Sequence, residues 1–114
     1  MTDCVFCKIA AGEIPASVVY EDDKVIAFDD LEPQMPVHTL IIPKQHFANI
    51  GDGLPDNLMG HLFNTVKNVA EIKGINKTGY RVIVNTGDDA QQSVHHIHVH
   101  VLGGAPMNSG SPAL

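Results

Sequence analysis

The chain has 114 residues, a length that favours one compact domain with its own buried core. Its formal net charge of −6, with seven Lys and Arg residues and no Trp, disfavours a nucleic-acid groove, because phosphate backbones are held mainly by clustered cations. Hydrophobic residues make up 44% and charged residues 18%, and no apolar run is long enough for a membrane span, so we expect a soluble globular protein.

The first residues show neither a basic stretch nor an apolar leader, and we therefore expect a cytoplasmic protein. The stretch "DCVFCKIAAGEIP" closes on Gly12 and Pro15, as a short N-terminal helix or turn would. Two β-rich runs follow, at residues 17–20 and 25–28, and the polar residues between them predict a hairpin. After a loop, "VHTLIIP" is a third strand that Pro43 ends.

Between Pro55 and Gly74 the pattern changes to that of an amphipathic helix. Apolar residues recur at helical spacing, namely Leu58, Met59, Leu62, Phe63, Val66, Val69 and Ala70. Two further strands are expected in "GYRVIVNTG" and "HHIHVHVLGG", while residues 105–114 form a tail without a pattern of regular structure. One long helix with about five short strands indicates an α+β fold, with a mostly antiparallel sheet in a single domain over residues 1–104.

Four of the seven histidines stand close together in "SVHHIHVHVLGG". Because side chains alternate along a strand, His96, His98 and His100 are expected on one face, and the apolar residues between them on the face beneath the helix. His95 has the other parity. Three imidazoles in strict alternation suit either a metal site or covalent catalysis at phosphorus, since a neutral imidazole serves as ligand and as nucleophile.

The preceding loop separates the two readings. A metal site on the triad would draw further ligands from Asp88 and Asp89, but no carboxylate stands on the histidine face of the strand itself. The same loop offers Asn85, Gln92 and Ser93 as neutral donors, which suit a phosphate group and its transition state. The residues therefore favour phosphate chemistry over a metal centred on the triad.

Taken together, these segments resemble the histidine triad (HIT) superfamily, whose signature is His-φ-His-φ-His-φ-φ with φ apolar. The segment "QSVHHIHVHVLGG" is similar to that signature, and the resemblance extends from "FCKIAAGEIP" through "VIAFDDLEPQMPVHTLIIPKQHF" to "LGG". The branch it most resembles is the nucleotide-binding, purine nucleoside phosphoramidase branch. The resemblance implies a HIT-like fold, a homodimer, and a hydrolase of AMP-amine or AMP-lysine phosphoramidates that needs no cofactor for catalysis.

The resemblance also assigns roles to residues. It implies that His98 is the nucleophile and forms a nucleotidyl-histidine, that His96 orients it, that His100 contacts the phosphate, and that His38 lies near the triad. Ser93 and Asn85 match phosphate-side donors, with Gln92 beside them. Asp30 matches the ribose-binding acid, with Leu31 next to it. The slot for the purine base is implied to consist of Phe6, Ile14 and Phe28. Each also has a structural reading, as core, turn or capping residues.

Two functional alternatives stay open on the sequence. One is a nucleotide-binding regulatory module that uses the same pocket without turnover. The other is a dinucleotide hydrolase or nucleotidyltransferase of the same superfamily.

The pair Cys4 and Cys7 forms a C-x-x-C motif, for which zinc is a stronger reading than a disulfide or a redox pair in a cytosolic protein. Zinc needs two more ligands, and His46 with a histidine at the start of the triad strand would complete a tetrahedron. The resemblance to paired-cysteine family members implies that this histidine is His96. The alternative is a pair of buried apolar thiols one helical turn apart.

Three positions depart from the family pattern. Gln91 stands where nucleotide-binding relatives commonly have Gly, and His95 replaces a frequently aromatic residue. The tail after Gly104 lacks the tryptophan of some relatives, which bears on the choice of leaving group.

Overall fold

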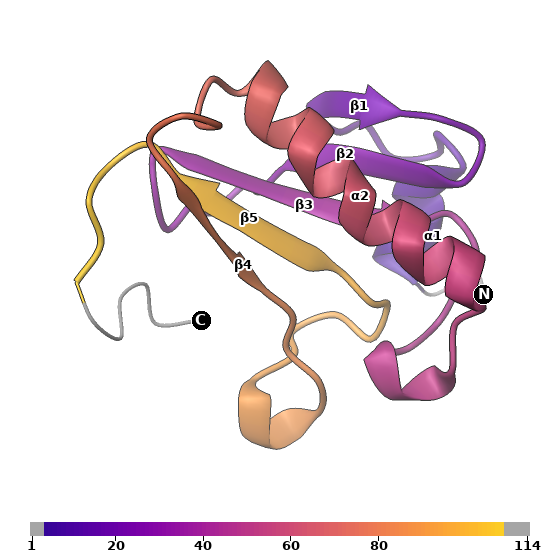
Figure 1. The fold of residues 1–114 in the computed structure, drawn as a ribbon. Helices are drawn as coiled ribbons and strands as arrows, with labels where there is room; N and C mark the ends of the chain where they lie inside the picture. The colour runs from indigo at the N-terminus through magenta and orange to yellow at the C-terminus, as the bar shows by residue number, and fades with distance from the viewer. Residues whose placement is uncertain (1–3, 109–114) are drawn as a thin grey trace.

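A five-stranded antiparallel sheet forms the centre of the computed structural model, which describes residues 4–108. The strands lie in the order β1-β2-β3-β5-β4, and each neighbouring pair is antiparallel (Figure 1). The hairpin and the third strand predicted from the sequence are present. The strand bounds are β1 Val18–Glu21, β2 Val25–Asp29, β3 Val37–Pro43, β4 Tyr80–Ile83 and β5 Val99–Gly103.

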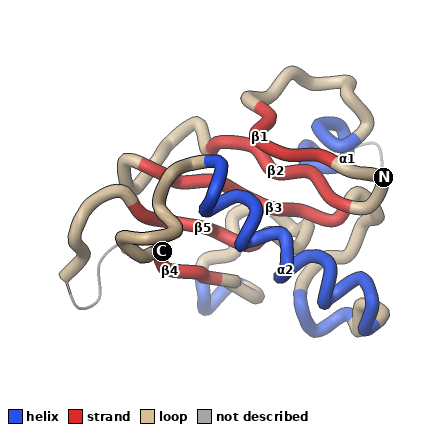
Figure 2. Tube along the Cα trace, turned by 45° about the horizontal axis from the view of Figure 1, so that its top comes forward, coloured by secondary structure: helices blue, strands red, loops and turns tan. Residues whose placement is uncertain are grey.

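The long helix α2, Asp56–Ile72, lies across one face of the sheet (Figures 1 and 2). It begins after Pro55 and ends at Ile72. Gly74, at φ 74°, follows where the chain leaves the helix, as the sequence predicts. Its apolar side is buried against the inward-facing residues of the central strands and of the segment before β5, among them Val25, Ala27, Ile41, Ile97, Val99 and Val101. This cluster is the larger of the two cores.

The opposite face of the sheet carries the short helix α1, Val5–Ala10, which the sequence predicts as a short helix or turn. Its buried residue Phe6 packs with Ile26, Phe28, Leu40 and Ile42 in a second cluster. Cys4 caps the helix, because its sulfur accepts a hydrogen bond from the Cys7 N–H at 3.3 Å. The two faces of the sheet are therefore covered by different helices, and α1 lies on the face that carries His98 and His100.

The last two strands are shorter than predicted. The sequence predicts a strand from His95, whereas β5 starts at Val99 and β4 stops at Ile83. The ladder ends there because Pro43 closes β3 and its carbonyl oxygen accepts from the His96 ring at 2.8 Å, while the Ile97 N–H turns to the Phe47 carbonyl at 2.7 Å. His96 and His98 therefore precede β5 and are held by side-chain hydrogen bonds to backbone.

Several segments outside the sheet complete the fold. Two 3₁₀ turns that the sequence did not predict occur at Ile50–Asp52 and Asp88–Ala90. Of the predicted tail, residues 105–108 have no helix or strand, and residues 109–114 lie outside the described residues. Within the described part of the chain, neither α-helix has both the length and the apolar composition needed to cross a bilayer. His61, on α2 and outside every motif, has its Nε2 2.7 Å from the Asp22 carboxylate.

Candidate functional site

A cavity of about 390 Å³ opens on the α1 side of the sheet, a size typical of small-molecule sites. Its polar lining residues are Ser17, Asp29, Asp30, Glu32, Ser93, His98 and His100. Its apolar residues come mainly from α1, the segment that follows it, β2 and β3, and they include Val5, Phe6, Ile9, Ile14, Phe28 and Leu40. The cavity thus combines an apolar wall with polar groups that include two of the triad histidines, and the part lined by Ser93, His98 and His100 is here called its polar end.

The proton on His98 is placed by a backbone carbonyl. His98 is 4% exposed, and its Nδ1 lies 2.8 Å from the His96 carbonyl oxygen. A carbonyl oxygen can only accept, so Nδ1 carries the proton and Nε2 of the neutral ring keeps its lone pair. Burial lowers the pKa of His98, which favours this neutral form at pH 7. His98 therefore presents an unprotonated nitrogen at a cavity wall.

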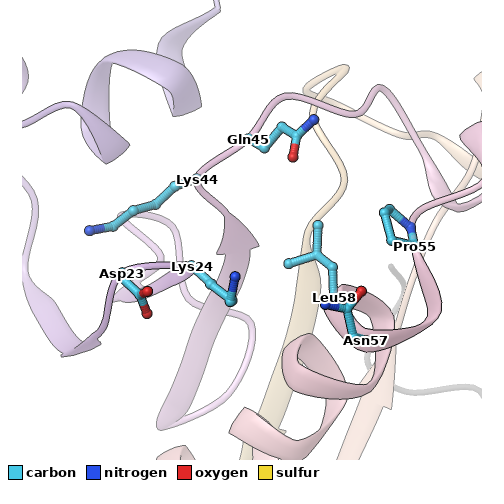
Figure 3. A pocket seen from close by; sticks show the side chains of 7 residues that line it. All are labelled: Asp23, Lys24, Lys44, Gln45, Pro55, Asn57 and Leu58. Carbon is cyan, nitrogen blue, oxygen red and sulfur yellow. The ribbon is translucent and has the colours of Figure 1, made fainter.

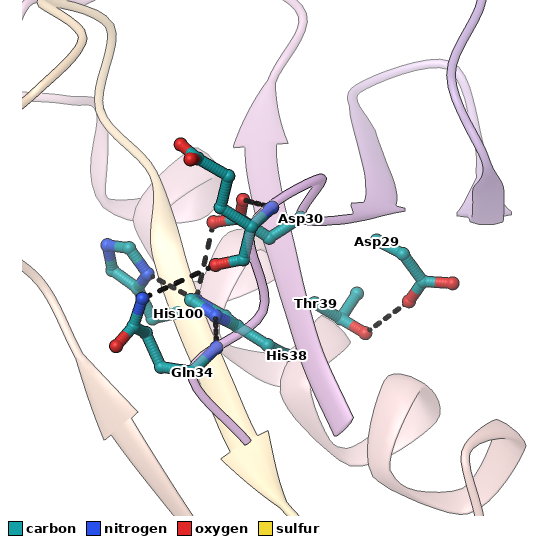
Figure 4. Close-up of polar contacts among 7 residues, drawn as sticks. Asp29, Asp30, Gln34, His38, Thr39 and His100 are labelled. Carbon is teal, nitrogen blue, oxygen red and sulfur yellow. Dashed lines mark hydrogen bonds and ion pairs between the residues drawn. The ribbon is translucent and has the colours of Figure 1, made fainter. Parts of the chain in front are cut away.

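His38 is also oriented by a hydrogen bond to the backbone, in which its ring is the acceptor. Its Nδ1 accepts from the Gln34 backbone N–H at 3.0 Å, so the proton of the neutral ring is on Nε2. That nitrogen lies 2.9 Å from His100 Nδ1 and 3.5 Å from the Asp30 carboxylate (Figure 4). Because two N–H groups cannot face each other at 2.9 Å, His100 Nδ1 must accept.

The remaining proton of His100 therefore lies on Nε2. This nitrogen has no hydrogen-bond partner within residues 4–108, and it is buried in a residue that is only 6% exposed. An unsatisfied buried donor costs about 1–3 kcal/mol. Such a donor beside the lone pair of His98, in a cavity of this size, is suited to a ligand that brings an acceptor.

Burial lowers the pKa of His100 to about 4, and the neighbouring rings of His98 and His38 contribute to this lowering. The unfolded chain, with an ordinary pKa of about 6.5, binds more protons between these values. The contribution of His100 to stability is therefore complete above pH 6.5 and is lost as the pH falls toward 4.

We expect this loss to be about 2 to 3 kcal/mol between pH 7 and pH 4.5, measured by urea unfolding with chelator present. A His100→Gln variant, which keeps a donor but does not titrate, should lose less than the parent by that amount. Equal pH dependence in the two proteins would contradict the assignment.

A second group of polar side chains includes His96 of the triad. Cys4, Cys7, His46 and His96, here called the Cys/His cluster, have ligand atoms that all lie within 4.8 Å of one another. His96 Nδ1 is 3.3 Å from Cys4 Sγ, 3.5 Å from Cys7 Sγ and 3.2 Å from His46 Nδ1, and Cys7 Sγ is 3.2 Å from His46 Nδ1. A zinc tetrahedron of two thiolates and two imidazoles has edges of about 3.3 to 3.8 Å.

The donor set fits zinc chemically as well as geometrically. The proton of His96 is on Nε2, which donates to the Pro43 carbonyl at 2.8 Å, so the lone pair of Nδ1 points into the cluster. Burial and the neighbouring Cys4 thiol raise the pKa of Cys7, so two thiolates at this place need a cation between them. All four positions would be filled by protein ligands, which is the pattern of a structural site.

Asp30, His38 and His100 form another group with metal-ligand spacing. Here the protons argue against a metal, because the Nε2 of His38 that faces the other two residues is the protonated nitrogen. Asp88 and Asp89, considered above as further ligands, lie exposed in their 3₁₀ turn and belong to neither group. The geometry therefore separates a metal-type cluster from a proton-relay cluster that share the same stretch of chain.

Comparison with known proteins identifies the family to which this arrangement belongs. The family model of the HIT domain matches residues 11–107. The chain belongs to the HIT family. A 14 kDa zinc-binding protein of Brassica juncea is 46% identical to it over 115 residues, which cover 93% of this chain and 96% of the relative.

Two solved HIT structures show the same architecture. A HIT family hydrolase from Legionella pneumophila Philadelphia 1 has a TM-score of 0.89 at 45% identity, with 93% of this chain and 96% of that chain covered. A histidine triad nucleotide-binding protein from Candida albicans has a TM-score of 0.82 at 34% identity, covering 93% of this chain and 85% of that chain. The predicted α+β HIT fold is thereby confirmed.

Most residues that the sequence placed at the substrate lie around the cavity of this HIT domain. Phe6, Ile14 and Phe28 line its apolar wall, and Asp30 and Leu31 line its rim. Leu31 is 95% exposed, so its side chain stands free at the mouth. Asp30 also closes a turn, because its Oδ1 accepts from the Glu32 N–H at 2.9 Å.

Two predicted contact residues are not among those lining the cavity. The buried amide of Gln92 is fully engaged with backbone: it donates to the Ala48 and Val94 carbonyls at 2.6 and 3.0 Å and accepts from the Gly87 N–H at 2.9 Å. Gln92 thus ties the loop before β5 to the segment after β3. Asn85 is half-buried just beyond β4.

Gln91 adopts the left-handed backbone conformation, with φ 60° and ψ 42°. It is the only residue other than glycine with positive φ within residues 4–108. A glycine would take this conformation without strain, so the loop keeps a glycine-like backbone despite the substitution noted above. We expect Gln91→Val to lower the free energy of unfolding by about 1–2 kcal/mol, since a β-branched residue fits this region poorly. Gln91→Gly, measured beside it by urea unfolding, should be at least as stable as the parent.

Sequence reasoning missed the backbone groups that orient the rings, namely the Gln34 N–H and the Pro43 and His96 carbonyls. No residue type marks such a group. It also missed Val5, Ile9, Leu40 and Val94 on the cavity wall. Their apolar character is the only signal in the sequence, and it equally fits a core.

A smaller cavity of about 240 Å³ lies where β2 and β3 meet the start of α2 (Figure 3). Lys24 and Lys44 line it together with Asp23, and Lys44 pairs with Glu21 at 2.6 Å. None of its lining residues is a histidine or a cysteine. This cavity therefore adds no histidine or cysteine chemistry to that of the histidine cavity.

Proposed function

We propose that this HIT protein hydrolyses purine nucleoside 5′-phosphoramidates, of the AMP-amine or AMP-lysine type, through a covalent nucleotidyl-histidine on His98. The observation that carries the proposal is the bond from His98 Nδ1 to the His96 carbonyl, which leaves Nε2 as a lone pair at the cavity. The hydrolase from Legionella and the nucleotide-binding protein from Candida support the class of reaction and of ligand.

In the proposed complex the purine base lies against Phe6, Ile14 and Phe28, which form the apolar wall. The ribose hydroxyls bind the Asp30 carboxylate, with Leu31 beside it at the mouth. The α-phosphate is then at the polar end, within reach of Ser93, His98 and His100. Asn85 would complete the phosphate side, and Gln92 acts by holding the loop that carries Ser93.

The first chemical step forms the bond between His98 Nε2 and phosphorus and breaks the bond between phosphorus and the amine nitrogen. The Nε2–H of His100 donates to a phosphate oxygen and satisfies the buried donor that has no partner within residues 4–108. The leaving amine takes a proton, from Ser93 or from the histidine relay. As His98 gains positive charge, its Nδ1–H bond to the His96 carbonyl strengthens.

In the second step, water attacks the phosphorus of the nucleotidyl-histidine. The water gives up a proton to the group that protonated the amine, the P–Nε2 bond breaks, a nucleoside monophosphate leaves, and His98 returns to the neutral form with its lone pair on Nε2. His38 keeps His100 in the required tautomer throughout, and the Asp30 carboxylate near its Nε2 favours any positive charge that reaches it. The Cys/His cluster takes no part in these bond changes; a zinc ion bound there would supply structural cross-linking.

The protein is also proposed to act as a homodimer. The edge strand β4 exposes the apolar side chains of Tyr80 and Val82, which are 39% and 38% exposed. The expected contribution of each tail to the partner's site falls partly on residues 109–114, outside the described residues. Light scattering after gel filtration should give twice the chain mass of 12.3 kDa.

The test is to trap the intermediate. The protein is mixed with an adenosine phosphoramidate, quenched in alkali, under which a phosphohistidine bond survives, and digested for peptide mass spectrometry. An AMP adduct on the peptide containing His98, absent from His98→Ala, is the expected result. Turnover without any adduct on that residue would overturn the covalent route, and binding without turnover would leave a nucleotide-binding module.

A further inference from the structure

His96 belongs to two groups at once. Its ring enters the Cys/His cluster through Nδ1, while its backbone carbonyl accepts the Nδ1–H of His98 at 2.8 Å. The ring is also tied to the Pro43 carbonyl by Nε2, and the residue is 0% exposed. His96 therefore connects the Cys/His cluster to the carbonyl that orients the nucleophile.

Phe6 makes a second connection between the same two groups. It stands between Cys4 and Cys7 at the start of α1, so both thiols are attached to the turn that carries its ring. The ring packs edge to face on His98 with centroids 5.2 Å apart, and on His96 with centroids 6.1 Å apart. It also lines the histidine cavity.

Helix α1 has only six residues, too few to be stable by itself. Its attachments to the sheet are the Phe6 cluster and the four side chains of the Cys/His cluster. A cation that joins both thiols to His46 and His96 would convert the second attachment into a rigid cross-link. The position of Phe6 in the cavity wall then depends on whether that cross-link is present.

We propose that the Cys/His cluster positions the nucleophile and the base wall: a divalent metal held there fixes the His96 carbonyl on His98 and the Phe6 ring on the cavity, so that metal and nucleotide strengthen each other's binding. Cys4, Cys7 and His46 are in this sense positioning residues for a site they do not touch. The nucleotide part rests on the proposed function, whereas the effect on the His98 ring does not.

Because coupling is reciprocal, the factor by which zinc tightens AMP must equal the factor by which AMP tightens zinc. We expect this factor to be about tenfold, within the usual range of coupled sites. Zinc affinity, measured by competition with a chromophoric chelator with and without AMP, gives the factor without any turnover. Calorimetric titration of AMP into zinc-loaded and zinc-free protein gives it a second time.

Two variants separate coupling from general loosening. Phe6→Leu keeps all four ligands and an apolar wall but removes the ring, and should reduce the factor to about twofold or less. Val69→Ala removes two methyl groups from the core between α2 and the sheet. It should lower the free energy of unfolding and leave the coupling factor at its parent value. A factor lost equally in both variants would overturn the role of Phe6 and with it the proposal.

The second readout needs no nucleotide. In protein labelled with ¹⁵N-histidine and held at one pH, zinc should sharpen and shift the Nδ1–H signal of His98, as its bond to the His96 carbonyl becomes fixed; Cys7→Ser should abolish this response. A His98 signal indifferent to zinc, with AMP binding unchanged by zinc, would overturn the coupling and leave the proposed function standing. Failure of AMP to bind at all, with the zinc response of His98 present, would instead remove the proposed function and support the positioning.

Discussion

Replacing His98 by alanine is expected to lower kcat/KM for an adenosine phosphoramidate by about 10⁴-fold or more, the scale seen when a nucleophile is removed. The structure supplies the reason: in the proposed reaction the bond to phosphorus is made by Nε2, whose lone pair exists because Nδ1–H is held by the His96 carbonyl. No other described histidine on the cavity offers a free lone pair, since both nitrogens of His100 act in other roles.

Nucleotide binding should survive this change. The apolar wall, the Asp30 carboxylate and the His100 donor are all still present, so the Kd for AMP should stay within about threefold, a difference below 1 kcal/mol. Steady-state kinetics and calorimetry on the same preparations measure the two quantities. The matched control is His95→Ala in the same segment, which removes an exposed imidazole and should leave kcat/KM unchanged. If His98→Ala kept more than a tenth of parental activity, the nucleophile would be misassigned.

The faces of the histidine segment could be predicted from alternation alone. Ile97, Val99 and Val101 lie in the core beneath α2, and His98 and His100 line the opposite side of the sheet. Binary patterning determines this because burial of alternate residues is a local property of the chain. The helical spacing of apolar residues likewise predicts the amphipathic α2, and Gly74 predicts that the helix ends just before it.

What alternation could not predict is that the three histidines do three different things. His96 shares the parity of His98, yet its ring turns into the Cys/His cluster because the Pro43 carbonyl, 53 residues away, accepts from it. The protons of His38 and His100 depend likewise on the Gln34 N–H and on contact between β3 and β5. Such tautomers are set by tertiary hydrogen bonds, which leave no mark on residue type.

Gln92 shows the opposite case, in which a suitable side chain at a suitable place is already engaged. Its amide has the donors and the acceptor that a phosphate loop needs, and the family motif places it beside Ser93. In the fold, these groups bind the backbone of two other segments. Whether a polar side chain is available to a ligand is decided by loop packing, which sequence pattern does not specify.

The second large effect is expected from zinc. Four ligands with the spacing of a tetrahedron, two of them thiols, should bind one zinc ion per chain, and free zinc at about a thousand times Kd should raise the free energy of unfolding by about 4 kcal/mol. For a domain of this length that corresponds to an increase in Tm of roughly 15 °C. Thermal unfolding with zinc and with chelator, beside metal analysis of protein purified without added zinc, gives both numbers.

The variant Cys7→Ser tests whether the cluster is the site, because a serine hydroxyl is a poor zinc ligand of similar size. It should unfold at the same temperature with zinc and with chelator, near that of the zinc-free parent. His61→Ala is the control, since it removes an imidazole paired with Asp22 and should keep the full response to zinc. Substoichiometric zinc, or an equal response in Cys7→Ser, would instead indicate two thiols that only pack, and the link from α1 to the histidine cavity would then rest on the Phe6 ring alone.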